Sequence, residues 1–252
     1  MLGLEFPGSD GRVDPDELYL ARGPEETSPY RPYLIGDVFD GVAIPTGAGG
    51  EKKRRVAILQ HPCSMRKDGV NLKDSILVAK VSRRRPLTAD QWGGGYFGIM
   101  PLPELEDSDN PKHRDHAIDF GDLYTVSPGQ LEAADRMASL SAIGINLLLQ
   151  RWVHYMSRVV VPTFTFDEAT SPFYEEADLI EEWCEQTAAD GTQDAIRAAG
   201  IECMEQLRAD RPGGRTYQKM LQDPQARSTV RKALRKELRE RARHTGTAEL
   251  QP

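Results

Sequence analysis

The chain has 252 residues, of which 39% are hydrophobic and 28% are charged, and its formal net charge is −7. This composition is typical of a globular protein that buries a core, and the negative charge excludes a nonspecific polyanion binder. No apolar run reaches the roughly 18 residues that a membrane span needs, and residues 1–26 do not resemble a secretory signal. Cys63, Cys184 and Cys203 are too widely spaced for a disulfide framework, which indicates a reducing, cytoplasmic location.

Charge is segregated along the chain. Residues 167–205 hold twelve acidic side chains and one basic one, whereas residues 206–246 hold twelve basic and four acidic side chains. Two basic runs, residues 52–55 and 80–85, lie in the first half. We expect the acidic and basic blocks either to attract each other, within one chain or between chains, or to bind an external partner.

The first half of the chain has the sequence pattern of short β-strands. Residues 1–29 are rich in Gly, Pro, Asp and Glu without a sustained period, and they predict a flexible arm. Short β-prone segments then alternate with glycine and proline, at residues 34–39, 42–44, 56–60, 75–81, 96–102, 117–120 and 123–126. Such a series predicts a small, strongly bent sheet or β-barrel over residues 30–140.

After Ser127 the apolar period becomes helical. Ser141 is expected to cap a helix that Pro162 ends, and residues 171–172 (Ser-Pro) are expected to start the next one. Thr192 and Asp223 predict the starts of two further helices, the last with a basic coat. We therefore expect an α+β chain in which residues 141–252 form a helical C-terminal extension with acidic helices and a basic terminal helix.

Two groups of residues carry a family resemblance. Residues 36–38 (GDV) precede a glycine-rich loop and the run 54–59 (RRVAIL); residues 123–127 (LYTVS) precede Leu131, residues 136–141 (RMASLS) and a helix. Their order and spacing resemble those of MazF/PemK-type toxins over residues 30–155. The resemblance implies an SH3-like barrel, a homodimer, an antitoxin as protein partner, and cleavage of single-stranded RNA without a metal or cofactor.

The resemblance also implies a site. Arg54 or Arg55 matches the loop arginine that acts on the scissile phosphate, and Ser82 stands where the family carries a threonine at the reacting centre. An arginine fork suits phosphate oxygens because it binds them through two hydrogen bonds. The surrounding basic side chains are expected to bind nucleic acid, and they are Lys52, Lys53, Arg66, Lys80, Arg83, Arg84 and Arg85. Solvated basic turns beside buried strands are the alternative.

A second candidate site follows a predicted strand. His61 and Cys63 have the chemistry of a base and a thiolate nucleophile, and Arg66 would lower the pKa of the thiol. The alternative is a small buried cysteine beside a histidine that a turn satisfies. With His113 and His116 the same pair has the donors of a zinc site, although a solvated loop explains the two later histidines as well.

Two functions stay open at this stage. The first is an RNA-binding MazF/PemK-like protein with metal-independent endoribonuclease activity. The alternative is a non-catalytic nucleic-acid- or protein-binding module of a regulatory or phage-related complex. Tyr124 favours the alternative, because it stands where the family has a basic residue, and so does the helical extension.

Overall fold

The chain divides into two units. The computed structural model describes residues 3–47, 49–108, 110–188, 190–211 and 213–248. The sheet unit comprises Met1–Ser28 and Tyr33–Thr170, and the helical unit comprises Pro29–Pro32 and Ser171–Pro252. The boundary between the units falls inside the helix that begins at Phe164. The preceding helix, which follows residue 141, therefore belongs to the sheet unit and not to the C-terminal extension.

Seven antiparallel strands form one sheet in the sheet unit, in the order β1-β7-β2-β3-β4-β6-β5. Their bounds are β1 Tyr19–Arg22, β2 Val38–Pro45, β3 Glu51–Ile58, β4 Ile76–Arg83, β5 Ile99–Leu102, β6 His116–Val126 and β7 Asp135–Leu140. The mixed arrangement of an antiparallel sheet followed by C-terminal helices is confirmed. The closed SH3-like barrel is wrong, because β1 and β5 are the two edges and do not pair with each other among the described residues.

A bulge divides strand β6. Its last part pairs with β4 from Ile76↔Val126 to Ala79↔Leu123, and its first part resumes at Lys80↔Asp119. Residues 120–122 are therefore extra in β6, opposite the continuous Ala79 and Lys80. Such an insertion bends a strand and turns the neighbouring side chains in new directions.

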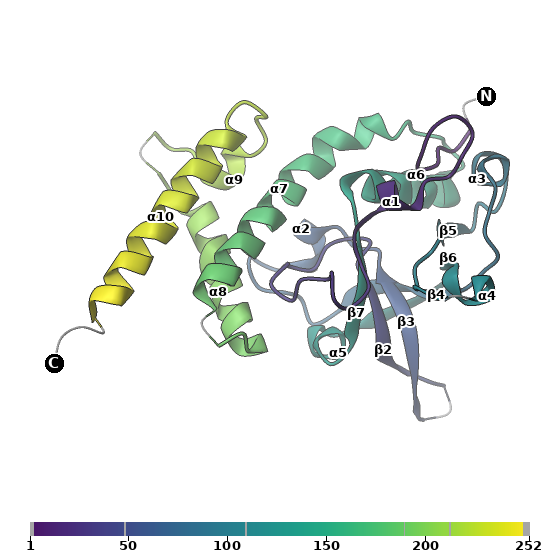
Figure 1. The fold of residues 1–252 in the computed structure, drawn as a ribbon, viewed down its shortest axis with the longest axis horizontal. Coiled ribbons are helices and arrows are strands. Elements are labelled where there is room, and N and C mark those ends of the chain that lie inside the picture. Colours follow the sequence, from purple (N-terminus) through teal and green to yellow (C-terminus); the bar gives the residue numbers. More distant parts are fainter. Residues whose placement is uncertain (1–2, 48, 109, 189, 212, 249–252) are drawn as a thin grey trace. The chain divides into compact units, whose positions relative to one another are not determined.

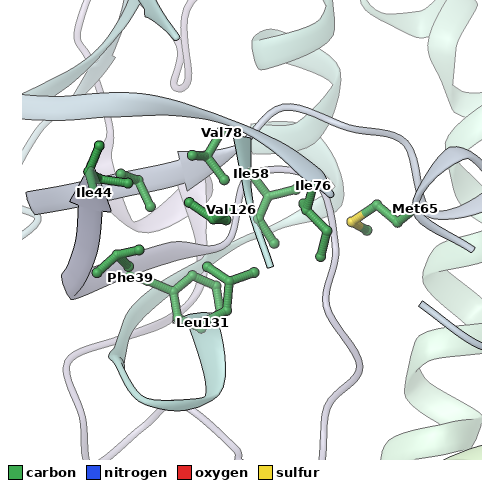
Figure 2. Packing of buried hydrophobic residues seen from close by; sticks show 10 residues of the cluster. Phe39, Ile44, Ile58, Met65, Ile76, Val78, Val126 and Leu131 are labelled. Atoms are coloured by element: carbon green, nitrogen blue, oxygen red, sulfur yellow. The ribbon is translucent and has the colours of Figure 1, made fainter. Parts of the chain in front are cut away.

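One cluster of the core lies on one face of the central strands, and the opposite face is buried as well, with Ala57, Ala79 and Ile118 at most 1% exposed. Figure 2 shows Phe39, Ile44, Ile58, Ile76 and Val126 side by side, and each of them is at most 2% exposed. The cluster consists of Phe39, Val42, Ile44, Val56, Ile58, Met65, Ile76, Val78, Val126 and Leu131. Residues of β3 and β4 that point to this face, such as Val56, Ile58, Ile76 and Val78, alternate with residues that point to the other.

The first residues of the chain belong to this unit and do not form the flexible arm that their composition predicts. Leu4 and Leu18 are buried, and β1 pairs with β7 at the edge of the sheet. Gln150 donates to the Glu5 carboxylate at 3.0 Å, and so does the Thr163 backbone amide at 2.9 Å. Specific apolar and polar contacts outweigh the local abundance of Gly and Pro.

Helix α6 (Ala142–Ser157) is the long helix that lies wholly within the sheet unit. The Ser141 hydroxyl caps it by accepting from the Gly144 amide at 3.0 Å, as the sequence predicts. A Cβ atom at Gly144 would lie 2.2 Å from the Leu18 carbonyl oxygen, so only glycine fits there. The remaining elements are short: α1 Pro15–Leu18, α2 Pro62–Met65, α3 Ala89–Gly94, α4 Pro111–Arg114 and α5 Pro128–Glu132.

Arg151 connects α6 to the segment before β5 through hydrogen bonds. Its side chain is fully buried, and its Nε donates to the Ile99 carbonyl at 2.9 Å. The two Nη atoms donate to the carbonyls of Trp92, Gly95 and Tyr96 at 3.0, 3.5 and 3.3 Å. Burial lowers the pKa of Arg151 to about 10, which still leaves it charged at neutral pH. One guanidinium therefore satisfies four carbonyl groups of a glycine-rich segment.

Helices α8, α9 and α10 form the helical unit together with most of α7. The bounds are α7 Phe164–Thr187, α8 Gln193–Arg208, α9 Tyr217–Met220 and α10 Arg227–Ala248. The start expected at residues 171–172 is wrong, because α7 begins at Phe164 and Pro172 lies inside it. Thr192 caps α8 as expected. Among the described residues, no helix has both the length and the apolar composition to cross a bilayer.

Opposite charges meet within the helical unit. Basic side chains of α10 pair with acidic side chains of α7 and α8, and the pairs are Arg231–Glu175, Arg235–Glu182 and Arg241–Glu202. Buried Arg31 donates to Asp178 and Glu181 of α7 at 2.8 and 2.6 Å. The acidic and basic blocks therefore attract each other inside one chain, which is one of the two outcomes that we expected.

Replacing Arg151 tests its role in the fold. We expect Arg151→Met to lower the free energy of unfolding by about 3–5 kcal/mol, because buried carbonyls lose a charged donor. Urea unfolding followed by circular dichroism measures this change. Arg85→Met, at an exposed arginine of the same unit, should cost less than about 0.5 kcal/mol. Equal effects of the two changes would contradict the role given to Arg151.

Burial should also decide which ion pair matters in the helical unit. The Arg31 side chain is 3% exposed and that of Arg235 is 53% exposed. We expect Arg31→Met to cost about 2–4 kcal/mol, because it leaves two carboxylates without their buried partner. Arg235→Met should cost less than about 1 kcal/mol. Urea unfolding of both variants gives the comparison, and a larger cost for Arg235→Met would refute this ranking.

Candidate nucleic-acid interface

The two basic runs lie at the same end of a strand pair. Strands β3 and β4 are antiparallel with Val56 opposite Lys80, so residues that precede Val56 lie beside residues that follow Lys80. Lys52, Lys53 and Arg54 belong to the β2–β3 hairpin, which projects from the rest of the sheet unit in Figure 1. Residues 83–85 end β4 and begin the next loop. A surface shared by both runs is thus consistent with the register.

Arg54 lies over an aromatic ring. Its guanidinium carbon is 5.8 Å from the ring centroid of Tyr124 on β6. Among the described residues, no carboxylate forms an ion pair with Arg54. The charge of Arg54 also helps to lower the pKa of Asp122, so this carboxylate competes with an external anion for Arg54.

Lys80 and Tyr124 share one acidic neighbour. The Lys80 Nζ is 3.0 Å from an Asp122 oxygen, and the Tyr124 hydroxyl donates to the same carboxylate. The Tyr124 hydrogen bond, followed by Lys80, lowers the pKa of Asp122. Burial, followed by Asp122, raises the pKa of Tyr124. Asp122 thus fixes a lysine and a tyrosine beside the bulge of β6.

Arg54, Lys80 and Ser82 share one face of the sheet. Alternation along β3 places Arg54 on the same face as Val56, and Val56 is the register partner of Lys80. Alternation along β4 places Ser82 on that face as well. Tyr124 joins it as the register partner of Val78. We name Arg54, Lys80, Ser82 and Tyr124 the basic face.

Arg55 points to the opposite face and is already occupied by carboxylates. Its Nη2 lies 2.8 Å from an Asp40 oxygen, and its Nη1 lies 2.6 Å from a Glu106 oxygen. Burial is the largest single influence and opposes the charge of Asp40, but the hydrogen bond and the charge of Arg55, with the Gly41 amide, together outweigh it and lower the pKa of Asp40. Two carboxylates against one guanidinium give a net negative cluster, which repels a phosphate. Of the two candidate arginines, Arg54 is therefore the one better placed to bind an external anion.

His116 completes the Arg55 cluster. Its Nδ1 lies 3.2 Å from the Arg114 carbonyl oxygen, which only accepts, so we assign the ring proton to Nδ1. Its Nε2 is then free to accept from Arg55 Nη1 at 2.8 Å. Burial, followed by the charge of Arg55, lowers the pKa of His116. The imidazole is thus neutral at neutral pH, and its contact with Arg55 connects β6 to β3.

His61 and Cys63 have separate roles in helix α2. The His61 Nδ1 accepts from the Cys63 backbone amide at 3.2 Å, and His61 is the cap of the helix. Burial, followed by Arg66, lowers the pKa of His61. Cys63 is exposed, which differs from the buried cysteine of the alternative interpretation. The geometry pairs His61 with a backbone amide, and a thiolate nucleophile stays a prediction.

Other predicted site residues lie apart from this face or at its margin. Arg66 is buried and its Nη1 lies 3.4 Å from the Pro62 carbonyl oxygen, so it belongs to the interior. Arg84 is 3.9 Å from Asp119 on β6, which places it near the bulge. His113 is exposed and lies in α4, and no group of three His, Cys, Asp or Glu side chains in the described part of the chain is arranged to hold a metal ion.

The acidic members of both clusters escaped the sequence analysis. Asp40, Glu106 and Asp122 lie far from their basic partners in sequence, and only the pairing of β3, β4 and β6 brings them together. Strand alternation is the signal that separates Arg54 from Arg55, because adjacent residues of a strand point to opposite faces. Strand alternation can assign the two arginines to opposite faces only when the first residue of β3 is known.

The Arg55 cluster predicts how stability depends on pH. The pKa of His116 in the folded state lies below its ordinary value of 6.5, so the unfolded state binds the proton more readily. His116 therefore stabilises the fold above pH 6.5, and this contribution is lost as the pH falls through its lowered pKa. Protonation would also place two donors, Nε2 and Arg55 Nη1, face to face.

A glutamine should remove this pH dependence. We expect His116→Gln, which keeps a neutral acceptor for Arg55, to lose less stability than the wild type between pH 7 and pH 5 in urea unfolding. His113→Gln, at an exposed histidine, serves as the matched control and should follow the wild type. Parallel pH profiles for wild type and His116→Gln would show that His116 is not buried as a neutral base.

Comparison with known proteins assigns no family to this geometry. A scan against protein-family models finds no match, and a search of curated proteins finds none either. The functional conclusion therefore rests on the side chains of the basic face and their neighbours.

Proposed function

We propose that the sheet unit binds single-stranded RNA on the basic face, as a MazF/PemK-like protein. The observation that carries the proposal is the contrast between adjacent arginines. Arg55 forms ion pairs with Asp40 and Glu106. Arg54 lies over Tyr124, and in the described part of the chain no carboxylate is within ion-pair distance of it, although its charge acts on Asp122. Arg54 is thus available to a phosphate group, and Tyr124 adds an aromatic side chain beside it.

The neighbouring cations extend the same surface. Lys52 is exposed on the β2–β3 hairpin and shares the face of Arg54 by alternation, and Arg85 is exposed just beyond β4. Lys53 and Arg83 alternate to the opposite face, where the charge of Arg83 acts on His116. A chain of phosphates requires several cations along a path, because each contact releases counterions and adds affinity. The local excess of basic residues is compatible with the net charge of −7, since steering depends on where the charges are placed.

Fewer observations support metal-independent cleavage, which the resemblance implies, than support binding. Ser82 lies on the same face as Arg54, and in the family the corresponding threonine is at the reacting centre. Cleavage also needs groups that move protons to and from the ribose and the leaving oxygen. His61 caps a helix and Arg55 is held by carboxylates, so the candidate base and one candidate arginine have other partners. Binding is therefore the function that we assign to this face.

A non-catalytic protein-binding module is the second candidate. Leu123 is 41% exposed in the middle of β6, between Asp122 and Tyr124. An apolar side chain in that position suits a protein partner, such as an antitoxin or a second copy of the chain, as well as a nucleobase. A purified chain that is dimeric in sedimentation and does not bind RNA would favour this candidate.

RNA binding and its salt dependence test the proposal. We expect a labelled single-stranded RNA of 12 nucleotides to bind more weakly as salt rises, with a slope of log affinity against log salt of about −0.7 per phosphate contacted. Arg54→Ala should make this slope shallower by about 0.7 and weaken binding. Fluorescence anisotropy at several salt concentrations gives the slope, and electrophoresis of the same samples in EDTA detects any cleavage.

Two results would contradict the proposal. Absence of RNA binding would remove it, and an unchanged slope in Arg54→Ala would remove Arg54 from the interface. Arg12→Ala is the matched control, because Arg12 is an exposed arginine of the same unit outside the basic face. It should bind as the wild type does. Cleavage that disappears in Arg54→Ala would extend the assignment to an endoribonuclease.

A further inference from the structure

Helix α10 has apolar side chains on one side and basic and hydroxyl side chains on the other. Val230, Leu234 and Leu238 are at most 5% exposed and belong to the core of the helical unit. Their spacing of four residues places them along one stripe of the helix. The exposed side chains that point away from this stripe are Ser228, Thr229, Lys232, Lys236 and Arg239. We name these five residues the outer face of α10.

The cations of the outer face are largely free of carboxylates. Other basic side chains of α10 pair with α7 and α8, and they are Arg231, Arg235 and Arg241. On the outer face, Lys232 and Arg239 form no ion pair in the described part of the chain. Lys236 lies 3.6 Å from Glu240, with 72% of the lysine and 53% of the glutamate side chain exposed. Such an exposed pair is weak, because water and salt screen both charges, so an external anion can replace Glu240.

The chemistry of the outer face fits phosphate groups better than it fits a protein or a lipid surface. Lysine, arginine and hydroxyl side chains are the usual donors to the phosphate oxygens of nucleic acids. Protein interfaces have apolar or aromatic anchors at their centre and few lysines, whereas no residue of the outer face is apolar or aromatic. The apolar stripe of α10 is buried, so it is not available to enter a membrane.

We propose that the outer face of α10 is a second RNA-binding surface, which contacts phosphate groups only. This inference rests on the proposed function, because it assigns the same class of ligand to the helical unit. Lys232, Lys236 and Arg239 follow one another at about one helical turn, or about 5 Å, so their charges form a line along which phosphates can lie. Because phosphate contacts carry no sequence information, this surface binds single strands and duplexes of any sequence.

Lysine footprinting on the full chain reports on this surface directly. We expect a single-stranded RNA of about 12 nucleotides to protect Lys232 and Lys236 from acetylation by an activated ester, because a bound phosphate covers the amino group. A duplex of the same length should protect them as well. Lys67 and Lys73 are the matched controls, because they are exposed and each is followed directly by an aspartate, and they should stay reactive. Peptide mass spectrometry measures acetylation at each lysine.

Removing the three cations together should weaken RNA binding. The triple variant Lys232→Gln, Lys236→Gln and Arg239→Gln keeps good helix formers at exposed positions, and circular dichroism checks that it folds. We expect the slope of log affinity against log salt to become shallower by about 2, the share of three phosphate contacts. The matched control removes three exposed cations of the sheet unit by Arg12→Gln, Lys67→Gln and Lys73→Gln, and it should keep the wild-type slope. Fluorescence anisotropy of the labelled RNA gives both slopes.

The outcomes separate this inference from the proposed function. RNA that protects Lys52 but neither Lys232 nor Lys236 overturns the surface on α10 and leaves the basic face in place, and so does an unchanged slope in the triple α10 variant. Protection of Lys232 and Lys236 without Lys52 supports the surface on α10 and removes the basic face. Protection of Lys232 and Lys236 by polyglutamate and not by RNA overturns the inference in favour of an acidic protein partner. Absence of any RNA binding overturns both proposals.

Discussion

A buried guanidinium holds the long helix of the sheet unit in place. Arg151 forms hydrogen bonds with carbonyls of α3, of the following loop and of β5, and no carboxylate in the described part of the chain pairs with it. Because residues four apart lie on one side of a helix, Tyr155 follows Arg151 along α6. The contacts that fix Arg151 therefore also set the position of Tyr155 relative to Gly98, which lies in the same loop.

Strand geometry gives neighbouring residues different chemistry. Arg54 and Arg55 are adjacent in a basic run, yet one lies over Tyr124 and the other contacts Asp40, Glu106 and His116. The difference follows from alternation along β3. The cluster around Arg55 then connects β2, β3 and β6 on one face, while the opposite face keeps a guanidinium for a ligand. Stability and recognition are thus divided between two adjacent arginines.

Local patterns predicted the elements better than their assembly. The strands between residues 38 and 126 and the helices capped by Ser141 and Thr192 were predictable, because apolar periodicity and capping are local signals. Strands β1 and β7 were missed, and β7 lies where a helical period was expected. The closed barrel was wrong because strand order depends on long-range pairing. The flexible arm was wrong because contacts such as Gln150 with Glu5 join residues 145 positions apart.

In the candidate site, too, local features were predictable from the sequence and long-range contacts were not. Sequence identified the basic residues, since a run of lysine and arginine is visible without a fold, but it did not choose between Arg54 and Arg55. Arg151 was missed because a fully buried arginine is rare, and nothing in its neighbourhood marks it as buried. Its partners are backbone carbonyls, which carry no sequence signal at all.

Ion pairs within each unit decide which basic side chains remain available to an external anion. In the helical unit, α10 has many basic residues, but Arg231, Arg235 and Arg241 already contact glutamates of α7 and α8. Three of the eight basic residues of this segment are therefore already paired with carboxylates of other helices in the same chain. On the basic face of the sheet unit, Arg54 has no such partner among the described residues. Recognition of an anion thus depends less on how many cations a segment carries than on how many of them the fold leaves without a carboxylate.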